Sequence, residues 1–188
     1  MKVNRIQGFT VIELMITMAV LVILLAVAVP SFRAVIQSNR VTASTNQLLT
    51  ALNFARSEAV KRGQVVSLCM ADTSSPPKCQ TGGGDDWANG WLAFLNPSGS
   101  ASYSSYSDDV LRVWDPLPDD IELEVNDTDV AETRRVDYQP MGNVDTDGTS
   151  FQFQWVVKPA DCKTGQPYQR TIDISAAGRA QVRDEKCS

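Results

Sequence analysis

Histidine is absent from the 188-residue sequence. Its absence excludes Ser-His-Asp triads and metal centres built on histidine. Basic residues are scarce after residue 65: residues 66–188 contain 10 Lys and Arg and 20 Asp and Glu, which gives a net charge of −10. Adjacent acids such as Asp85-Asp86 and Asp119-Asp120 are typical of surface turns, since neighbouring side chains in an extended chain point apart. We therefore expect neither an enzyme nor a cofactor.

Charge is also nearly absent from one long segment close to the N-terminus. From Phe9 to Val29 there are 21 residues, and Glu13 is the only charged one among them. As a helix this segment would span about 32 Å, enough to cross a hydrocarbon core. An ionisable residue in such a segment indicates a function, because lipid offers it no good partner. In the first helical turn, its carboxylate would also offset the positive end of the helix dipole.

The block Gly8-Phe9-Thr10-Val11-Ile12-Glu13, which follows a short basic leader, resembles the N-terminus of type IV prepilins. The resemblance implies that a prepilin peptidase cuts the chain after Gly8 and that Phe9 becomes N-methylated. It also implies that Glu13 pairs with the N-terminal amine of the preceding subunit during assembly. The alternative for Glu13 is a glutamate that settles at the membrane interface because of the helix dipole alone.

The same segment also satisfies the pattern of a secretory signal peptide. Lys2 and Arg5 form a basic start, an apolar run follows, and Ala26-Val27-Ala28 offers the small residues of a cleavage site. Cleavage after Ala28 would release a soluble secreted domain that binds a ligand. The first residue of the mature protein, Phe9 or Val29, distinguishes the two hypotheses.

Four cysteines stand at positions that do not follow a zinc motif: Cys69, Cys79, Cys162 and Cys187. Charges flank the apolar run on both sides and leave its orientation ambiguous. We interpret the cysteines as disulfides, which form in oxidising compartments, and so place their segment outside the cytoplasm. Three pairings are possible, and proximity along the chain favours Cys69–Cys79 and Cys162–Cys187 without proving them. Free buried thiols are the alternative.

A second helical pattern continues beyond the apolar run. Apolar residues at steps of three and four mark one face of an amphipathic helix: Val41, Leu48, Leu52, Ala55 and Ala59. Pro30 removes one helical hydrogen bond, so we expect it to interrupt and bend the helix. Lys61, Arg62 and Gly63 form a stop signal. The sequence predicts one long helix over about residues 9–62.

From residue 64 onward the pattern indicates strands separated by turns. Ile121, Leu123 and Val125 alternate with glutamates, which is typical of a half-buried strand. The candidate strands are Val65–Leu68, Trp91–Leu95, Val110–Trp114, Ile121–Val125, Val136–Tyr138, Phe151–Val157 and Thr171–Ile174. We predict an α+β fold, in which a long N-terminal helix packs its C-terminal half on an antiparallel β-sheet head.

Several motifs of the head resemble the GspH/FimT branch of pseudopilins and minor pilins. These motifs are Ala55-Arg56-Ser57-Glu58-Ala59, Leu68-Cys69, Asp86-Trp87, Gly90-Trp91-Leu92-Ala93-Phe94, Thr171-Ile172-Asp173-Ile174-Ser175 and Gly178-Arg179. Within the branch, the cysteines and the Gly-Trp pattern favour the fimbrial side and FimU-like minor pilins. The motifs also predict structural roles: Trp87, Trp91 and Phe94 in the core, and Arg56 and Glu58 exposed on the helix.

The resemblance implies a minor type IV pilin that helps to initiate the type IV pilus and is incorporated into it, in fimbrial biogenesis and twitching motility. The expected organisation is a leader over 1–8, a transmembrane and assembly helix over 9–29, its amphipathic continuation over 30–62 and a periplasmic β-rich head over 63–188. The protein would cross the inner membrane once before joining the fibre. Its partners would be other minor and major pilins, through the N-terminal helix, and prepilin peptidase. An H-type pseudopilin of a type II secretion system is the alternative.

Some members of the branch take up DNA through a basic Gly-Arg-x-Arg turn near the C-terminus. Here Gly178-Arg179 is followed by Gln181 in place of the second arginine, although Arg183 lies nearby. Phosphate binding depends on clustered cations, and an acidic head repels a polyanion. We therefore do not expect nucleic acid as a partner, and Arg179 and Arg183 are the residues that would bind it.

Two acidic features leave alternatives open. Residues 108–132 contain ten acids and only one base, Arg112. They form either a solvated face or a surface that meets a cation or a basic patch on a neighbouring pilin. Residues 143–148 resemble the opening of a calcium loop, with oxygen donors at alternate positions. Gln154 stands where the bidentate glutamate would be, so we expect a β-turn without metal.

Overall fold

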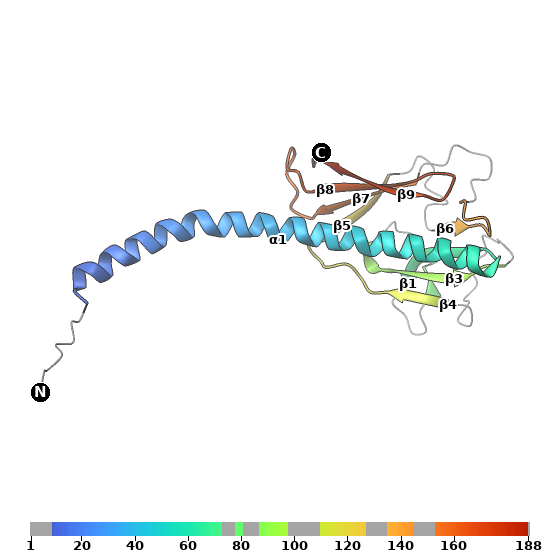
Figure 1. Cartoon of the computed structure of the whole chain (residues 1–188), viewed down its shortest axis with the longest axis horizontal. Helices are drawn as coiled ribbons and strands as arrows, with labels where there is room; N and C mark the ends of the chain where they lie inside the picture. The colour runs from blue at the N-terminus through green and yellow to red at the C-terminus, as the bar shows by residue number, and fades with distance from the viewer. Residues whose placement is uncertain are drawn as a thin grey trace, which may run out of the picture. The chain divides into compact units, whose positions relative to one another are not determined.

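The computed structural model describes residues 9–72, 78–80, 87–97, 110–126, 135–144 and 153–187. Its elements, in chain order, are α1 (Val11–Arg62), β1 (Val66–Asp72), β2 (Lys78–Cys79), the 3-10 helix η1 (Trp87–Asn89), β3 (Trp91–Leu95), β4 (Val110–Trp114), β5 (Ile121–Asn126), β6 (Arg135–Tyr138), β7 (Phe153–Pro159), β8 (Gln169–Ile174) and β9 (Ala180–Glu185) (Figure 1). The chain divides into two compact units, Met1–Ser38 and Asn39–Ser188.

The helix α1 continues through position 30. It runs without a break from Val11 to Arg62, so the predicted single helix is confirmed, and Pro30 does not interrupt it. A proline costs a helix one hydrogen bond, which a long helix can tolerate. In the first unit, the large apolar side chains from Phe9 to Ile36 are exposed. Among the described residues, α1 is the one helix long and apolar enough to cross a membrane, a property that signal sequences share.

In the second unit, α1 buries one face and ends in an ion-paired turn. The buried residues recur at steps of three or four and are Val41, Ser44, Thr45, Leu48, Ala51, Leu52, Ala55 and Ala59. The Glu58 carboxylate accepts hydrogen bonds from Lys61 Nζ at 3.5 Å and Arg62 Nε at 2.6 Å. Its side chain is 13% exposed, so the expectation of a freely exposed Glu58 is wrong. The Arg62 hydrogen bond lowers the pKa of the Glu58 carboxyl below its ordinary value.

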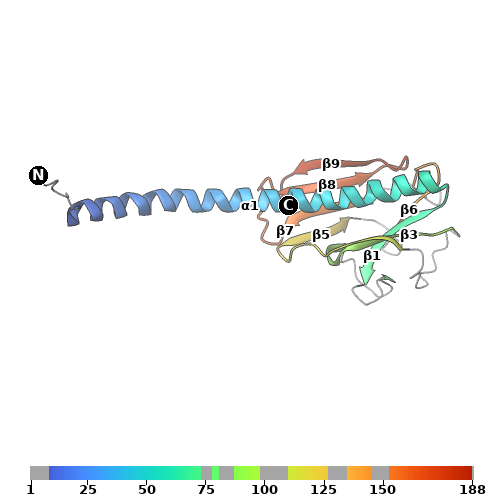
Figure 2. The ribbon, with the colours of Figure 1, turned by 60° about the horizontal axis from the view of Figure 1, so that its bottom comes forward.

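Two antiparallel sheets form the β part of the second unit. The first sheet has the order β2-β1-β3-β4, and β6 also pairs with β1. The second sheet has the order β5-β7-β8-β9. Figure 2 shows both sheets alongside the C-terminal half of α1. The predicted α+β architecture is confirmed.

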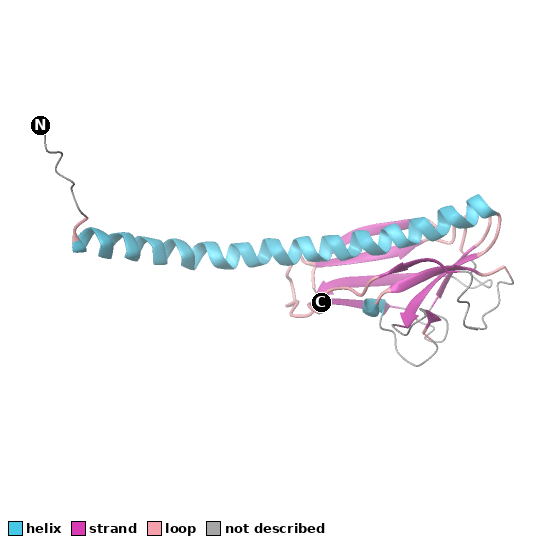
Figure 3. Ribbon diagram, turned by 90° about the horizontal axis from the view of Figure 1, so that it is seen from below, coloured by secondary structure: helices cyan, strands magenta, loops and turns pink. Residues whose placement is uncertain are grey.

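One hydrophobic core joins α1 to both sheets. Leu52 of α1, Leu68 of β1 and Val157 of β7 belong to the same buried cluster. Trp87 of η1 and Trp155 of β7 meet edge to face, with ring centroids 5.4 Å apart. Figure 3 shows the strands of both sheets lying along this half of α1. The sheets are therefore held together by shared side-chain packing with the helix.

The predicted core aromatics are confirmed, although they divide between two clusters. Trp87 and Trp91 are fully buried in the core under α1. Phe94 lies in a smaller cluster with Cys69, Ala71 and Leu92. Strand β1 contributes alternate residues to both clusters, which explains why its residues from Val66 to Ala71 are all buried.

The sequence pattern missed β2, η1 and β9. Strand β2 contains only two residues, too few for any periodicity. In β9, the five residues from Gln181 to Glu185 are all exposed, so polar and apolar residues do not alternate. This strand forms through pairing with β8, from Ala180 opposite Ile174 to Glu185 opposite Gln169. Its neighbour in space, and not its own sequence, makes it a strand.

The structure contains the two disulfides that proximity favours, Cys69–Cys79 and Cys162–Cys187. No cysteine is free. The first disulfide joins β1 to β2. The second joins the chain after β9 to the connection between β7 and β8, where Gly165 N donates to the Cys187 carbonyl oxygen at 2.8 Å. The C-terminal strand is thus covalently held at its outer end.

We predict that replacing both Cys162 and Cys187 by serine lowers the free energy of unfolding by about 2–4 kcal/mol, because the unfolded chain regains the freedom of the closed loop. Denaturant unfolding of the purified full-length chain in detergent measures this loss. Reduction of the wild type should give a loss at least as large, since it also opens Cys69–Cys79. A double variant as stable as the wild type would contradict a stabilising role for this disulfide.

Candidate functional site

A threonine caps the N-terminus of α1. Thr10 precedes the first helical residue, and its Oγ1 accepts a hydrogen bond from the Glu13 amide at 3.3 Å. Threonine followed by glutamate three residues later is the spacing of a capping box. Glu13 therefore lies in the first turn, where a negative charge is favourable. The Thr-x-x-Glu spacing could have revealed this cap, which the sequence analysis missed.

The residues around this cap are open to their surroundings. The Phe9 side chain is 86% exposed, and Glu13 is exposed as well. Gly8, after which cleavage is predicted, lies outside the described residues, as do Lys2 and Arg5. An amine created at Phe9 would stand immediately before the cap residue Thr10, at the positive end of the helix. The Glu13 carboxylate is then available either to this amine or to the amine of a neighbouring chain.

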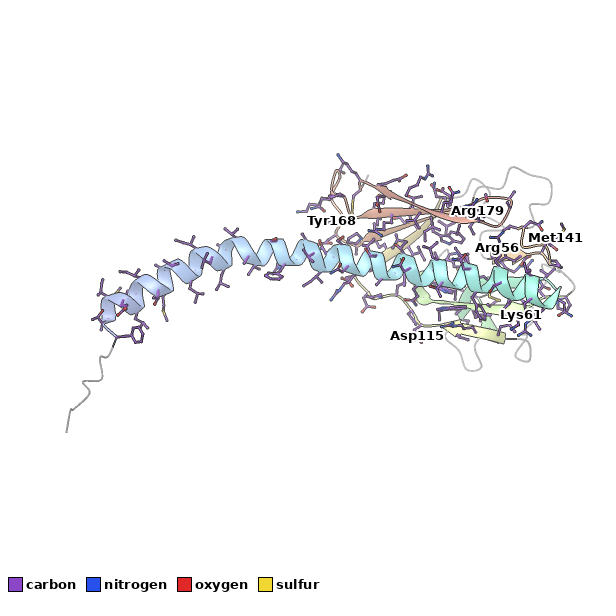
Figure 4. All side chains as sticks on the ribbon, viewed as in Figure 1. Arg56, Lys61, Asp115, Met141, Tyr168 and Arg179 are labelled. Atoms are coloured by element: carbon purple, nitrogen blue, oxygen red, sulfur yellow. A yellow bond between two sulfur atoms is a disulfide. The ribbon has the colours of Figure 1, made fainter. Side chains whose placement is uncertain are left out.

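At the other end of α1, Arg56 connects the helix to two turns. Its Nε donates to the Gly142 carbonyl oxygen at 2.9 Å, and its Nη2 donates to the Ala177 carbonyl oxygen at 3.1 Å. Gly142 follows β6 of the first sheet, and Ala177 lies in the turn between β8 and β9 of the second sheet. Figure 4 shows Arg56 beside Met141 and Arg179. The expectation that Arg56 is an exposed polar residue is therefore wrong, because its guanidinium bridges both sheets.

The two turns touch each other at glycines. Gly142 has a φ of 80° and Gly178 a φ of 74°, a region that favours glycine. A Cβ on Gly178 would lie 2.0 Å from the Gly142 carbonyl oxygen and 3.2 Å from Cε1 of Tyr138. Tyr138 is fully buried below, and burial raises the pKa of its hydroxyl well above the ordinary value. The absence of a side chain at Gly178 therefore permits close contact between the two turns.

The two arginines considered for DNA binding have different surroundings. Arg183 lies on β9, and its Nη2 binds the two carboxylate oxygens of Asp173 at 2.7 and 2.8 Å. This hydrogen bond raises the pKa of Arg183, which stays charged but is already paired. Arg179 lies in the exposed turn after Gly178, where its amide and carbonyl groups bond to Ser175. Among the residues that the structure describes, Arg179 has no side-chain partner and Arg183 is paired, so the two arginines do not offer two free cations.

Part of the acidic run is neutralised within the chain. Asp120 forms an ion pair with Arg40 of α1. Glu122 and Glu124 of β5 both contact Lys158 of β7, at 3.8 and 2.8 Å. Asp85, Asp86, Asp108, Asp109 and residues 127–132 lie outside the described residues.

The turn that resembles a calcium loop is described only in part. Residues 145–148 lie outside the described part of the chain. Within it, the Asn143 carbonyl oxygen accepts the Gln139 amide at 2.8 Å, and Val144 N donates to the Ala176 carbonyl oxygen at 3.1 Å. The described residues contain no group of three or more side chains that could hold a metal ion. The absence of metal at this turn stays a prediction.

We predict that Gly178→Ala destabilises the protein by more than about 2 kcal/mol, because backbone strain adds to a direct clash. Gly165→Ala is the matched control, since Gly165 also has a positive φ, 87°, but open space where the Cβ would be. Its cost should be only the strain, about 1–2 kcal/mol. Thermal unfolding of both variants tests the difference, and equal losses would show that the contact with Gly142 does not matter.

We also predict that Arg56→Ala costs about 2–3 kcal/mol of unfolding free energy, since two charge-assisted hydrogen bonds are lost. Arg179→Ala, which removes an exposed guanidinium from the neighbouring turn, should cost less than about 0.5 kcal/mol. Proteolysis of the folded state provides a second measurement, because the turn at Ala177 should open more often in Arg56→Ala. Equal stability of the two variants would argue against the bridge.

Two family models match the chain. The model described as Type II transport protein GspH matches residues 44–178. The model described as the prokaryotic N-terminal methylation motif matches residues 3–29. The first match contains the α1 face that packs on the sheets, Arg56 and both glycine turns. The second contains Phe9 and Glu13. No curated protein matches the chain.

The chain is similar to solved structures of a minor pilin and of a minor pseudopilin. The type IV minor pilin FimU of Pseudomonas aeruginosa has 20% sequence identity, over 77% of this chain and 89% of that chain, with a TM-score of 0.52. The minor pseudopilin EpsH of the type 2 secretion system of Vibrio cholerae has 12% identity, over 77% of this chain and 97% of that chain, with a TM-score of 0.49. The likeness to FimU shows a shared fold. Because its family model matches well over half of the sequence, the chain belongs to the GspH family of pilin-like proteins, and it carries their N-terminal methylation motif.

Proposed function

We propose that this protein is a minor type IV pilin, which helps to initiate the type IV pilus and is incorporated into it, in fimbrial biogenesis and twitching motility. The observation that carries the proposal is the exposed apolar helix, which begins with Phe9 and Glu13 and continues into a GspH-type head. Apolar surface of this extent needs lipid or other helices around it. A pilin first meets lipid and later the helices of its neighbours.

Processing would create the functional N-terminus. Prepilin peptidase would remove the leader, residues 1–8, and leave Phe9 with an N-methylated amine. This amine would stand one residue before the Thr10 cap, where the helix dipole disfavours positive charge. A carboxylate partner is therefore needed close by. The match to the N-terminal methylation motif over residues 3–29 supports this step.

Glu13 would supply the carboxylate during assembly. Opposite charges about 4 Å apart attract by roughly 4 kcal/mol at an effective dielectric constant near 20. In the membrane, Glu13 can pair only with its own amine or with that of another chain. Pairing with the preceding subunit would select one axial position for the incoming helix, and so fix its register in the fibre.

The membrane stage would place the head in the periplasm. Residues 9–29 would form the inner-membrane span and the assembly helix, and residues 30–62 its amphipathic continuation. The two disulfides favour an oxidising compartment for residues 63–188. The compact second unit begins at Asn39, within the amphipathic part of the helix. The helix residues from Val41 onward therefore belong to the fold of the head.

An H-type pseudopilin of a type II secretion system is the second candidate. The description of the matching family, Type II transport protein GspH, favours it. It would use the same processing and the same helix, but it would assemble with different neighbours. DNA uptake has less support, because Arg183 is paired with Asp173. A soluble secreted domain would require cleavage after Ala28, which would remove all but the last residue of the matched methylation motif.

We predict that Glu13→Val leaves processing intact but reduces the protein in the fibre by more than about tenfold, because the helix loses its partner for the amine. Sheared pili analysed by mass spectrometry measure incorporation. The wild-type chain should begin with methylated Phe9, and Glu13→Asp should retain part of the incorporation.

Three outcomes distinguish the candidates. A wild-type chain that begins at Val29 would refute every pilin hypothesis. If the wild-type protein is absent from pili but present in a pseudopilus, this result would favour the type II secretion candidate. Normal pilus number and length after deletion of the gene would contradict a role in initiation.

A further inference from the structure

An exposed apolar pair lies on the surface of the second unit next to the Arg56 bridge. Met141 is 89% exposed and Val60 is 54% exposed. Among the described residues 39–188, the other large apolar side chains that are exposed are Val113 and Val182. Val60 lies beside Gly142, the residue that follows Met141, because a Cβ built on Gly142 would lie 3.1 Å from Cγ2 of Val60. Two of the four exposed large apolar side chains in the described part of this unit, Val60 and Met141, therefore lie in one region of its surface.

Two arginines border this pair. Arg56 holds the Gly142 and Ala177 carbonyl oxygens, and Arg179 follows Gly178, whose turn abuts Gly142. Figure 4 labels Met141, Arg56 and Arg179 in the region where the turns at Gly142 and Gly178 meet. We call Arg56, Val60, Met141 and Arg179 the Met141 patch. It combines an apolar centre with a cationic border.

The free charge in the Met141 patch is that of Arg179. Its side chain is exposed and has no hydrogen-bond or ion-pair partner among the described residues. Two carboxylates on the adjoining described elements are already paired, Glu58 with Lys61 and Arg62, and Asp173 with Arg183. Among the described residues, no carboxylate occupies the Arg179 guanidinium, so it can meet a carboxylate from outside this part of the chain.

The backbone that carries the Met141 patch is already held in place before a partner binds. Arg56 fixes both turns to α1, and the close contact between Gly142 and Gly178 fixes them to each other. Tyr138 fills the space below. Binding to such a surface orders little besides the Met141 and Arg179 side chains, which lowers the entropic cost of association.

The chemistry of the patch fits a protein better than a nucleic acid. Methionine and arginine are enriched at protein interfaces, and a guanidinium forms paired hydrogen bonds with a carboxylate. A polyanion would need several free cations, whereas Arg183 is paired and residues 66–188 carry a net charge of −10. The matching partner presents a carboxylate beside an apolar side chain.

We propose that the Met141 patch is a docking site for the acidic head surface of a neighbouring pilin subunit. This inference rests on the proposed function, because a fibre places heads next to one another. Arg179 binds a carboxylate of the neighbour, and Met141 and Val60 cover an apolar side chain beside it. The contact adds specificity between heads to the packing of the N-terminal helices.

Photo-crosslinking of the full-length chain in cells tests this site. With a photoreactive residue at position 141, we expect a product that joins the chain to another protein with a prepilin-type N-terminus, through a peptide that contains Asp or Glu. Arg179→Glu should reduce this product by at least about tenfold, and Arg179→Lys should reduce it less. Lys163→Glu is the matched control, because Lys163 is also exposed and should leave the product unchanged.

The same experiment includes the outcomes that would overturn the inference. An equal yield from position 182, or a yield that Arg179→Glu does not change, would show that the patch is not the docking site. Retardation of short duplex DNA by the detergent-solubilised chain, lost in Arg179→Glu, would assign the patch to nucleic acid instead. If the wild-type protein enters pili but gives no crosslinked product that depends on Arg179, the docking site alone is refuted. If the wild-type protein is absent from pili, the proposed function is refuted.

Folding of the variants is checked independently. Membrane levels of Arg179→Glu and the oxidised state of both disulfides should match the wild type, because the Arg179 side chain supports no other described residue. Met141→Asp provides a second variant, which should abolish a product formed from position 60. Retention of that product at the wild-type level would also count against the Met141 patch.

Discussion

The hydrogen bonds from Arg56 hold one helix against two separate sheets, and the arrangement of the head depends on this attachment. The two acceptors lie in turns that belong to different sheets, so one guanidinium connects three elements. Hydrophobic burial supplies most of the favourable free energy through the α1 stripe and the tryptophans, but burial is not directional. The directional bonds of Arg56, together with the close contact at Gly178, decide where along the helix each turn lies.

The sequence predicted those parts of the fold that local patterns control. The single helix, the disulfide pairs and strands such as Trp91–Leu95 and Val110–Trp114 agree with the structure, because apolar spacing and cysteine proximity are visible in the chain itself. The division into two sheets was not predictable, since it depends on which strands pair. Strand β9 was missed for the same reason, because pairing with β8 defines it and its own side chains are exposed.

For the candidate sites, too, the sequence predicted features that depend on neighbouring residues and missed contacts between residues far apart in the chain. Glu13 could be singled out because a charge in an apolar run is conspicuous, and its place in the first helical turn agrees with the structure. The role of Arg56 could not be read from sequence, because its partners lie 86 and 121 residues further along the chain. Arg183 seemed equivalent to Arg179 in the sequence, whereas the fold pairs Arg183 with Asp173 and gives the Arg179 side chain no partner among the described residues. The roles of Gly8, Phe9 and Glu13 stay predictions.

The disulfide Cys162–Cys187 would have a mechanical consequence in a fibre under tension. The chain between these cysteines, which includes β8 and β9, forms a closed covalent ring. Tension that reaches the ring cannot draw its strands out to their full contour length, even when the hydrogen bonds between them break. A surface filament pulled and exposed outside the cell would keep this part of its subunit intact.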